Sequence, residues 1–470
     1  MSVPAARIPA WVPGSLAAIA VISFTAGSAS VSSVKHVGHT ERWLALIALC
    51  AVALVRAAPQ LRRDGLPPGL RAFAWLPASF IALCLLSTAW SPDPRLTFAR
   101  TASLGILFLT AAALAVTTAS DSGEMRRLLE GIAIGAAVVG GIGFVMLTYG
   151  AKAAAQAANP QNPWRFRGLG ENPNTVAVLA GVALPIIAWL MLTSQTRSSR
   201  GLWFVAFAVL LASTIASGSR GGLLAALCGV EVVVLTTVPR VSKRLLIGVA
   251  YALVIVAGIG VRQVTQPGAP AFYSAIPPAP TGVLAPAPGH RSGAKLVIPP
   301  GPPMQPLPLR ADEIGHPLLS REGTTTVGSG RVAAWIGTLK DVVLERPLLG
   351  YGFGTEERVF VDRWYYFQGG TPENSILGVL LQVGLVGLLL LVALVAIVVA
   401  GAARALRGAK SHERSAARVG LGVLAAALVL TFFQAYVYSV GNVATLTVWV
   451  VLYLTAVGTL GARADRLGRV

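Results

Sequence analysis

Twelve long apolar runs, separated by short polar segments, constrain the fold of this chain more than any other feature. A helix needs about 20 apolar residues to cross the hydrocarbon of a bilayer. The runs that approach this length are 12–33, 43–57, 72–90, 101–119, 131–149, 173–193, 201–216, 222–238, 245–261, 376–402, 419–438 and 443–461. They predict an all-α fold, a polytopic transmembrane helical bundle of about 12 spans.

The composition favours the same fold class. Hydrophobic residues make up 54% of the 470 residues and charged residues only 12%, which is roughly half the share in soluble domains. Such a chain has too little polar surface to cover a water-soluble globule. The first run is long and further runs follow at once, so we expect a retained anchor there rather than a cleaved signal peptide.

The basic residues predict an orientation. With the N-terminus inside and the spans alternating, the inner segments carry 20 Lys and Arg and the short outer segments carry 8. Because basic residues favour cytoplasmic loops, this distribution predicts that both termini are cytoplasmic. The net charge of +19 then reflects these loops. Since no basic run is interleaved with aromatic residues, we expect no nucleic-acid partner.

The segment 262–375 is predicted to be one large outer-face loop that contains short helices. Its stretch 267–308 holds 13 of the 30 prolines, a composition that predicts extended or disordered chain. Apolar residues then recur at helical spacing from Val332 to Leu344, which predicts an ordered cap of one or two helices. The predicted divisions are nine spans in 1–261, a proline-rich loop in 262–320, the cap in 321–375 and three spans in 376–470.

Four polar clusters fall on the predicted outer side, where ionisable groups at helix ends are functional candidates. The first is "RFRGLGENPNTVA", in which Arg165 and Arg167 precede a glycine turn and Asn172 and Asn174 flank a proline that opens a helix. One interpretation is a solvated loop with an ordinary helix cap. The other is a cationic wall beside a helix N-terminus that binds an anion.

Two further clusters contain one arginine each. In "ASGSRGG", a tight turn between two spans needs Gly and Ser219 but does not need Arg220, so this arginine favours a functional role. In "GSGRVAAW", Arg331 opens a predicted helix and Trp335 follows one turn later, as a binding pair or as a surface arginine beside a core tryptophan. The nearby "GYGFG" lacks the strand–turn–helix context of a dinucleotide site.

The fourth cluster is "GGTPENSILGVLLQVGLVG", where the long loop returns to the membrane with Glu373 and Asn374. A carboxylate at this depth is expected to be partly desolvated and to serve as a general base. The alternative is an acid favoured by the helix dipole. The sequence contains no DxD motif and no His/Cys cluster, so we expect neither a metal nor another cofactor. Arginines can bind a diphosphate without a metal.

The order of these motifs resembles the O-antigen ligase / polysaccharide polymerase (Wzy-C-like) superfamily of bacterial membrane glycosyltransferases. The resemblance covers about residues 70–460 and includes, in order, "SPDPR", "GLGENPN", "SGSRGG", "GRVAAW", "PLLGYGFG" and "PENSILGVLLQVGLVG". It implies a multi-pass protein of the bacterial cytoplasmic membrane that moves a glycan from a polyprenyl diphosphate carrier to the hydroxyl of a glycan or lipid acceptor.

The resemblance also implies roles for single residues. Arg220 and Arg331 match the arginines that hold the diphosphate, and Glu373 stands where ligases usually carry a histidine before the asparagine. The catalytic candidates are therefore Glu373, Arg220 and Arg331. The substrate-binding candidates are Arg165, Arg167, Asn172, Asn174, Ser219, Trp335 and Asn374.

Two other classes of function compete with glycan transfer. A glycan-lipid flippase or exporter without chemistry should place charged residues near the middle of several spans. The span interiors here are nearly free of charge, with Glu231 as the main exception. A non-enzymatic scaffold would leave the four clusters without a reason to share one face. Transfer is thus the favoured hypothesis, and the choice between ligase and polymerase, the sugar, the acceptor and the oligomeric state stay open.

Overall fold

The computed structural model describes residues 8–119, 121–150, 152–157, 164–265, 331–341, 343–360, 372–408 and 410–467. Almost all of the predicted proline-rich loop lies outside these residues, as does part of the predicted cap. The predicted division of the chain into 1–261, 262–320, 321–375 and 376–470 therefore stays a prediction.

Helices make up nearly all of the described chain. The helices are α1 (Trp11–Ala26), α2 (Ser32–Asp64), α3 (Pro68–Phe73), α4 (Trp75–Leu86), α5 (Pro94–Thr118), α6 (Ser122–Thr148), α7 (Pro173–Thr193), α8 (Arg197–Ser217), α9 (Arg220–Thr237), α10 (Val241–Thr265), α11 (Arg331–Asp341), α12 (Glu356–Phe360), α13 (Ser375–Gly408), α14 (Ser411–Thr431) and α15 (Thr445–Leu467). Single 3₁₀ turns are η1 (Ser87–Ala89), η2 (Lys152–Ala154) and η4 (Val343–Glu345). The strands β1 (Ala155–Gln156) and β2 (Arg165–Phe166) pair antiparallel.

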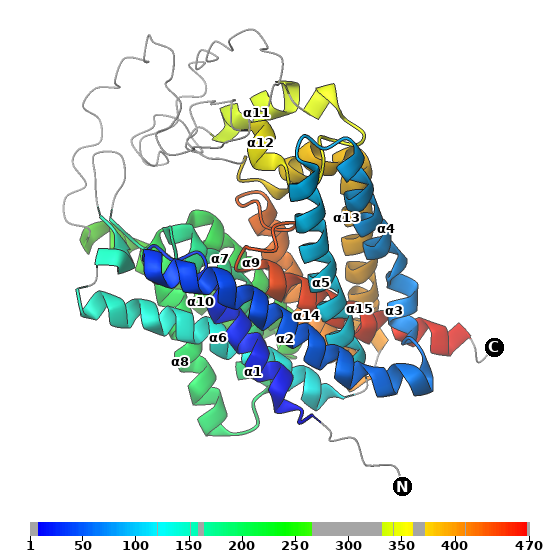
Figure 1. The fold of residues 1–470 in the computed structure, drawn as a ribbon. Coiled ribbons are helices and arrows are strands. Elements are labelled where there is room, and N and C mark those ends of the chain that lie inside the picture. The colour runs from blue at the N-terminus through cyan, green and yellow to red at the C-terminus, as the bar shows by residue number, and fades with distance from the viewer. Residues whose placement is uncertain are drawn as a thin grey trace, which may run out of the picture.

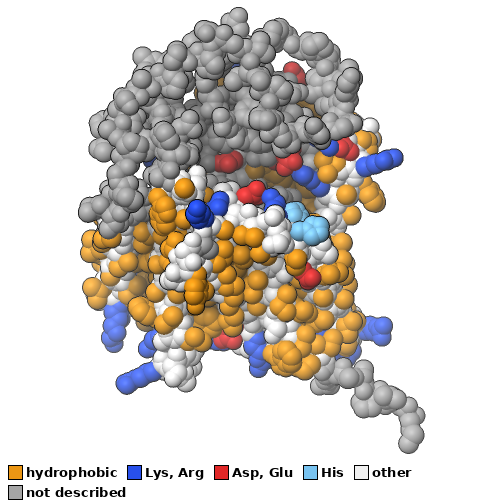
Figure 2. Space-filling view, turned by 60° about the vertical axis from the view of Figure 1, so that its left-hand side comes forward, with side chains coloured by type: hydrophobic (Ala, Val, Ile, Leu, Met, Phe, Trp, Pro, Cys, Tyr) orange, Lys and Arg blue, Asp and Glu red, His pale blue; other side chains and the backbone are white. Residues whose placement is uncertain are grey.

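Among the described residues, nine helices are long and apolar enough to cross a membrane, judged by length and composition. These nine are α2, α5, α6, α7, α8, α9, α10, α13 and α14. Three shorter apolar helices are Trp11–Ala26, Trp75–Ala89 and Thr445–Leu460. Each of the twelve predicted runs overlaps one of them, so the predicted all-α polytopic bundle is confirmed. Figure 2 shows the corresponding belt of hydrophobic side chains, with charged side chains gathered below it and along its upper edge.

Small residues let the helices approach each other closely. A Cβ added at Gly131 of α6 would lie 2.0 Å from the carbonyl oxygen of Gly14 in α1. One added at Gly222 of α9 would lie 2.7 Å from Ala177 Cβ in α7. Close contact between backbones is the usual way in which helices associate in a bilayer, because apolar side chains gain little there by leaving lipid.

The helix α13 is interrupted at Gly384, which has φ 63° and ψ −164°. The chain 347–352 fills the interruption. The amides of Tyr351 and Gly352 donate to the carbonyls of Leu381 and Gln382, each at 2.8 Å. On the other side of the break, the amide of Leu385 donates to the carbonyl of Pro347 at 2.8 Å. Backbone groups freed within a span need such partners, since lipid offers none.

The ends of two helices differ from the predicted runs. α2 has 33 residues and would be about 50 Å long, so its polar first turns extend beyond a hydrocarbon layer of about 30 Å. α14 ends at Thr431, although the apolar run continues to residue 438. After Thr431 the chain does not extend the span, and Phe433 instead packs against the start of α9. We call the connection between α14 and α15 the 432–444 segment.

The helices α11 and α12 lie over the end of the bundle where α13 begins (Figure 1). We call this the α11 end. The 432–444 segment, the start of α9 and the start of α7 lie at the same end, as the contacts below establish.

Candidate functional site

The 432–444 segment joins the starts of α9 and α13. A Cβ added at Gly221 in the first turn of α9 would lie 2.8 Å from Phe433 Cγ. The hydroxyl of Ser375, the first residue of α13, donates to the carbonyl of Gln434 at 2.6 Å and accepts from the amide of Tyr436 at 3.1 Å. Two motifs that are far apart in the sequence, "SGSRGG" and "PENSIL", therefore border one segment.

The turn before α13 is held in an unusual conformation. Glu373 has a φ of 45° and is, among the described residues, the one non-glycine residue with positive φ. Its half-buried side chain is followed by Asn374, whose Oδ1 accepts from the amides of Ile376 at 2.9 Å and Leu377 at 3.1 Å. Residues in this strained region persist where the surrounding structure enforces them, which is frequent at functional sites.

Trp335 connects α11 to the same turn. Its Nε1 donates to the carbonyl of Pro372 at 2.7 Å, directly before Glu373. Arg331 opens α11, but its side chain lies outside the described residues. Of the predicted pair, Trp335 therefore lies at the turn before α13. The predicted role of Arg331 stays a prediction.

At the start of α9, Ser219 and Arg220 differ in burial. Ser219 is buried and caps the helix, because its Oγ accepts from the amide of Gly222 at 3.4 Å. Arg220 is exposed at the first helical position. The capping contact gives Ser219 a structural role, and the exposed side chain of Arg220 lies at the α11 end.

The first predicted cluster is bound into the bundle. Arg165 is 4% exposed; its Nε donates to the carbonyl of Ser217 at 2.8 Å and its Nη2 to Asn174 Oδ1 at 3.0 Å. Asn172 caps α7 through the amides of Asn174 and Thr175. Arg167 Nε donates to the carbonyl of Ala153 at 2.7 Å. These contacts give the cluster a structural role, and substrate binding by these residues stays a prediction.

A carboxyl group absent from the sequence prediction lies beside this site. Glu356 is 3% exposed, and its Oε2 accepts from the Tyr438 hydroxyl at 2.5 Å and from Gln382 Nε2 at 3.4 Å. Its Oε1 has no hydrogen-bond partner among the described residues. Gln382 Oε1 in turn accepts from the amide of Gly354 at 2.7 Å. Glu356 thus connects the start of α12 to Gln382 of α13 and to Tyr438 of the 432–444 segment.

Burial raises the pKa of Glu356 to about 8, and the charge of Glu357 acts in the same direction. The hydrogen bond from Tyr438 and the charge of Arg100 oppose this shift without cancelling it. Burial first, and then the adjacent Glu356, raise the pKa of Tyr438 well above its usual range. Both groups therefore hold their protons at neutral pH.

The sequence offered only weak signals for this network. "GTEERVF" looks like a charged, solvated turn, and only a lone Gln382 within an apolar run indicated a polar partner. The glycines of "GYGFG" explain the geometry: Gly354 has φ 77°, and a Cβ there would lie 2.4 Å from Arg100 Cδ. The motif thus brings backbone against α5, which a side chain would prevent.

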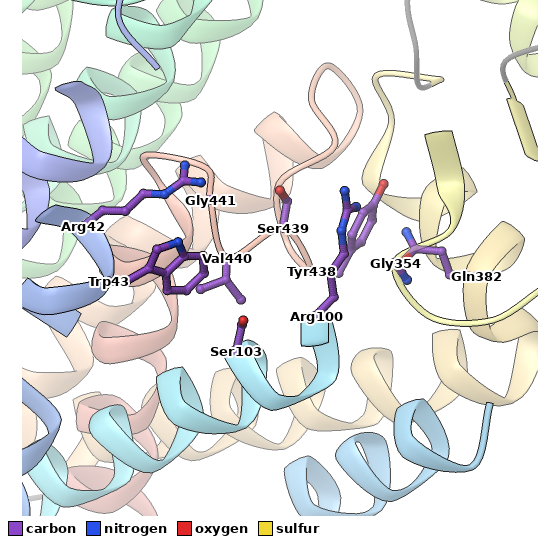
Figure 3. Close-up of a pocket in the computed structure, with 10 residues that line it drawn as sticks. All are labelled: Arg42, Trp43, Arg100, Ser103, Gly354, Gln382, Tyr438, Ser439, Val440 and Gly441. Carbon is purple, nitrogen blue, oxygen red and sulfur yellow. Dashed lines mark hydrogen bonds between the residues drawn. The ribbon is translucent and has the colours of Figure 1, made fainter. Parts of the chain in front are cut away.

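A cavity of about 310 Å³ lies next to this network. In Figure 3, Arg42 and Trp43 lie on one side, Tyr438, Arg100 and Gln382 on the other, and Ser439, Val440 and Ser103 between them. The lining residues are Arg42, Trp43, Arg100, Ser103, Gly354, Gln382, Tyr438, Ser439, Val440 and Gly441. Tyr438 and Gln382, which bond to Glu356, and Gly354, which bonds to Gln382, are all among these lining residues. Within the described ranges, no group of three or more His, Cys, Asp and Glu side chains could hold a metal ion.

Taken together, an apolar helical bundle and a polar site at one end define a multi-pass membrane protein. The model of the O-antigen ligase family matches residues 205–392, from within α8 to the interrupted α13. The matched part contains Arg220, Glu356 and Glu373. Over these residues the match confirms the resemblance inferred from the motif order. No curated protein matches the chain.

Proposed function

We propose that the protein is an O-antigen ligase-like or polymerase-like glycosyltransferase. It moves a glycan from a polyprenyl diphosphate carrier to the hydroxyl of a glycan or lipid acceptor, without a metal, at the outer face of the bacterial cytoplasmic membrane. Both termini are cytoplasmic in this proposal. The observation that carries it is the 432–444 segment, which touches the start of α9 behind Arg220 and the start of α13 behind Glu373. The 432–444 segment therefore lies beside both the cationic candidate, Arg220, and the acidic candidate, Glu373.

The proposed reaction forms one bond and breaks one. The acceptor hydroxyl oxygen attacks the anomeric carbon of the first sugar, and its proton passes to the carboxylate of Glu373. The bond from that carbon to the diphosphate breaks, and the electron pair leaves with the diphosphate oxygen. Arg220 and Arg331 offset the charge that develops there. The N-terminus of α9 adds a partial positive charge beside Arg220.

The test uses the full chain in lipid nanodiscs with a polyprenyl-diphosphate-linked glycan, candidate acceptors and chelator. Arg220→Ala, Arg331→Ala and Glu373→Gln should each lower the release of carrier diphosphate by roughly a hundredfold or more. Arg346→Ala, a change of an exposed arginine at the same end of the bundle, is the matched control and should retain activity.

The outcomes separate the parts of the proposal. Full activity of Glu373→Gln would exclude this residue as the base and leave the arginines in place. Activity that chelator abolishes would contradict the metal-free mechanism. Movement of the glycan lipid across the bilayer of sealed proteoliposomes, without any larger glycan product, would support the exporter instead.

A further inference from the structure

The cavity beside Glu356 has a lining suited to a sugar. Side chains able to form hydrogen bonds come from Ser103, Ser439 and Gln382. Trp43 supplies a large, partly buried aromatic surface from α2. A few placed polar groups beside an aromatic surface are the usual composition of a small-molecule site, and about 310 Å³ is near the lower limit of the roughly 300–1,000 Å³ that such sites have. The volume suits one sugar unit rather than a long chain.

The charge of the lining is positive. Arg42 and Arg100 line the cavity, and none of the described lining residues is a carboxylate. The Arg42 guanidinium contacts neutral groups among the described residues: its Nη2 is 2.7 Å from His39 Nδ1, and its central carbon lies 5.3 Å from the centre of the Trp43 ring. Its Nε is shielded from solvent without a hydrogen-bond partner among the described residues. Arg100 is 3.7 Å from Glu357 Oε2, a pair whose side chains are 39% and 61% exposed. The charge of Arg42 is thus the less compensated of the two.

The wall opposite Arg42 has a fixed shape. Tyr438 is held by Glu356, and an added Cβ at Gly378 would lie 1.8 Å from its hydroxyl oxygen. Gln382 is held by the same carboxyl and by the amide of Gly354. Glu356 itself lies behind this wall, buried at 3% exposure. It is therefore a positioning residue for the cavity and leaves the lining without negative charge.

We propose that this cavity binds a sugar unit that carries an anionic group, with Arg42 pairing with the anion and Trp43 packing on the sugar ring. That this sugar belongs to the transferred or the accepting glycan rests on the proposed function. The binding site itself rests on the lining. Guanidinium groups pair well with carboxylates, sulfates and phosphates, whereas hydroxyls of a neutral sugar gain no such charge-assisted contact.

The test measures binding to the full chain in lipid nanodiscs by calorimetry. The probes are a glucuronate-containing hyaluronan tetrasaccharide, the neutral tetrasaccharide made from it by reducing its carboxylates to alcohols, and inorganic pyrophosphate. The acidic tetrasaccharide should bind on the order of tenfold tighter than the neutral one, because one charge-assisted contact distinguishes them. This preference should shrink as salt is added.

Variants locate the effect. Arg42→Ala should abolish the preference, and Arg42→Lys should retain part of it, since the charge stays but the planar fork is lost. Ser103→Phe should fill the cavity from the α5 side and weaken both tetrasaccharides. Arg346→Ala should change neither. A preference that survives Arg42→Ala, or equal binding of the two tetrasaccharides, overturns the proposal.

Three remaining outcomes distinguish the source of the anion and distinguish a failure of this proposal from a failure of the proposed function. If pyrophosphate displaces the acidic tetrasaccharide and loses affinity in Arg42→Ala as much as that probe does, the site takes the carrier diphosphate and the sugar assignment is wrong. Glycan transfer in a protein without the acidic preference refutes the subsite and keeps the transferase. An acidic preference without transfer keeps the subsite and refutes the transferase.

Discussion

Replacing Glu356 by glutamine tests whether one buried proton makes the stability of this protein depend on pH. In the folded protein the pKa of Glu356 is raised to about 8, from an ordinary value of 4.5, chiefly by burial. Between these two values the folded state holds a proton that the unfolded state has lost. Stability from this group is therefore fully present below about pH 4.5, and it is lost as the pH rises through about 8.

The magnitude follows from the two pKa values. One pKa unit corresponds to about 1.4 kcal/mol, so the whole shift corresponds to on the order of 5 kcal/mol. The part of this free energy that changes near neutral pH is the part that an unfolding experiment can measure. Between pH 6 and pH 8 the free energy of unfolding of the wild type should fall by roughly 2 to 3 kcal/mol from this residue alone. Glutamine has nearly the same shape, accepts from the Tyr438 hydroxyl and does not titrate.

The assay is equilibrium unfolding in detergent micelles, followed by near-UV circular dichroism at pH 6, 7 and 8. Glu356→Gln should remove the fall seen in the wild type. Glu357→Gln changes the adjacent side chain, which is 61% exposed, and should keep a fall of similar size. An equal fall in wild type and Glu356→Gln would refute the reasoning, because the titrating group would then lie elsewhere.

Two further predictions concern the start of α13. Gly378→Ala should lower the free energy of unfolding by about 1 to 3 kcal/mol, because the added Cβ would meet the Tyr438 hydroxyl at 1.8 Å; Gly105→Ala, where nothing lies within 4 Å, should not, and chemical denaturation compares the two. Asn374→Ala should cost about 1 kcal/mol through loss of the α13 cap, while Asn374→Asp restores it; equal stability of all three proteins would contradict the capping role.

The sequence located the candidate site at helix ends but did not assemble it. Asn172 and Asn374 were recognisable because a helix cap depends on residues two or three positions away. The motif "PLLGYGFG" was also visible, but its role was not. Its backbone completes the hydrogen bonds of the interrupted α13, and these contacts join residues that are 30 to 38 positions apart in the chain.

The sequence by itself determined the membrane class, the bundle of apolar helices and an order of motifs that resembles the O-antigen ligase superfamily. These properties follow from local hydrophobicity and short spacings. Only the tertiary structure decided that α14 stops at Thr431, that the 432–444 segment joins α9 to α13, and that Glu356 is buried against Tyr438. It also brought Arg42 and Arg100 to one cavity. Such contacts depend on how distant helices pack, because burial and charge compensation are properties of the neighbours in space rather than along the chain.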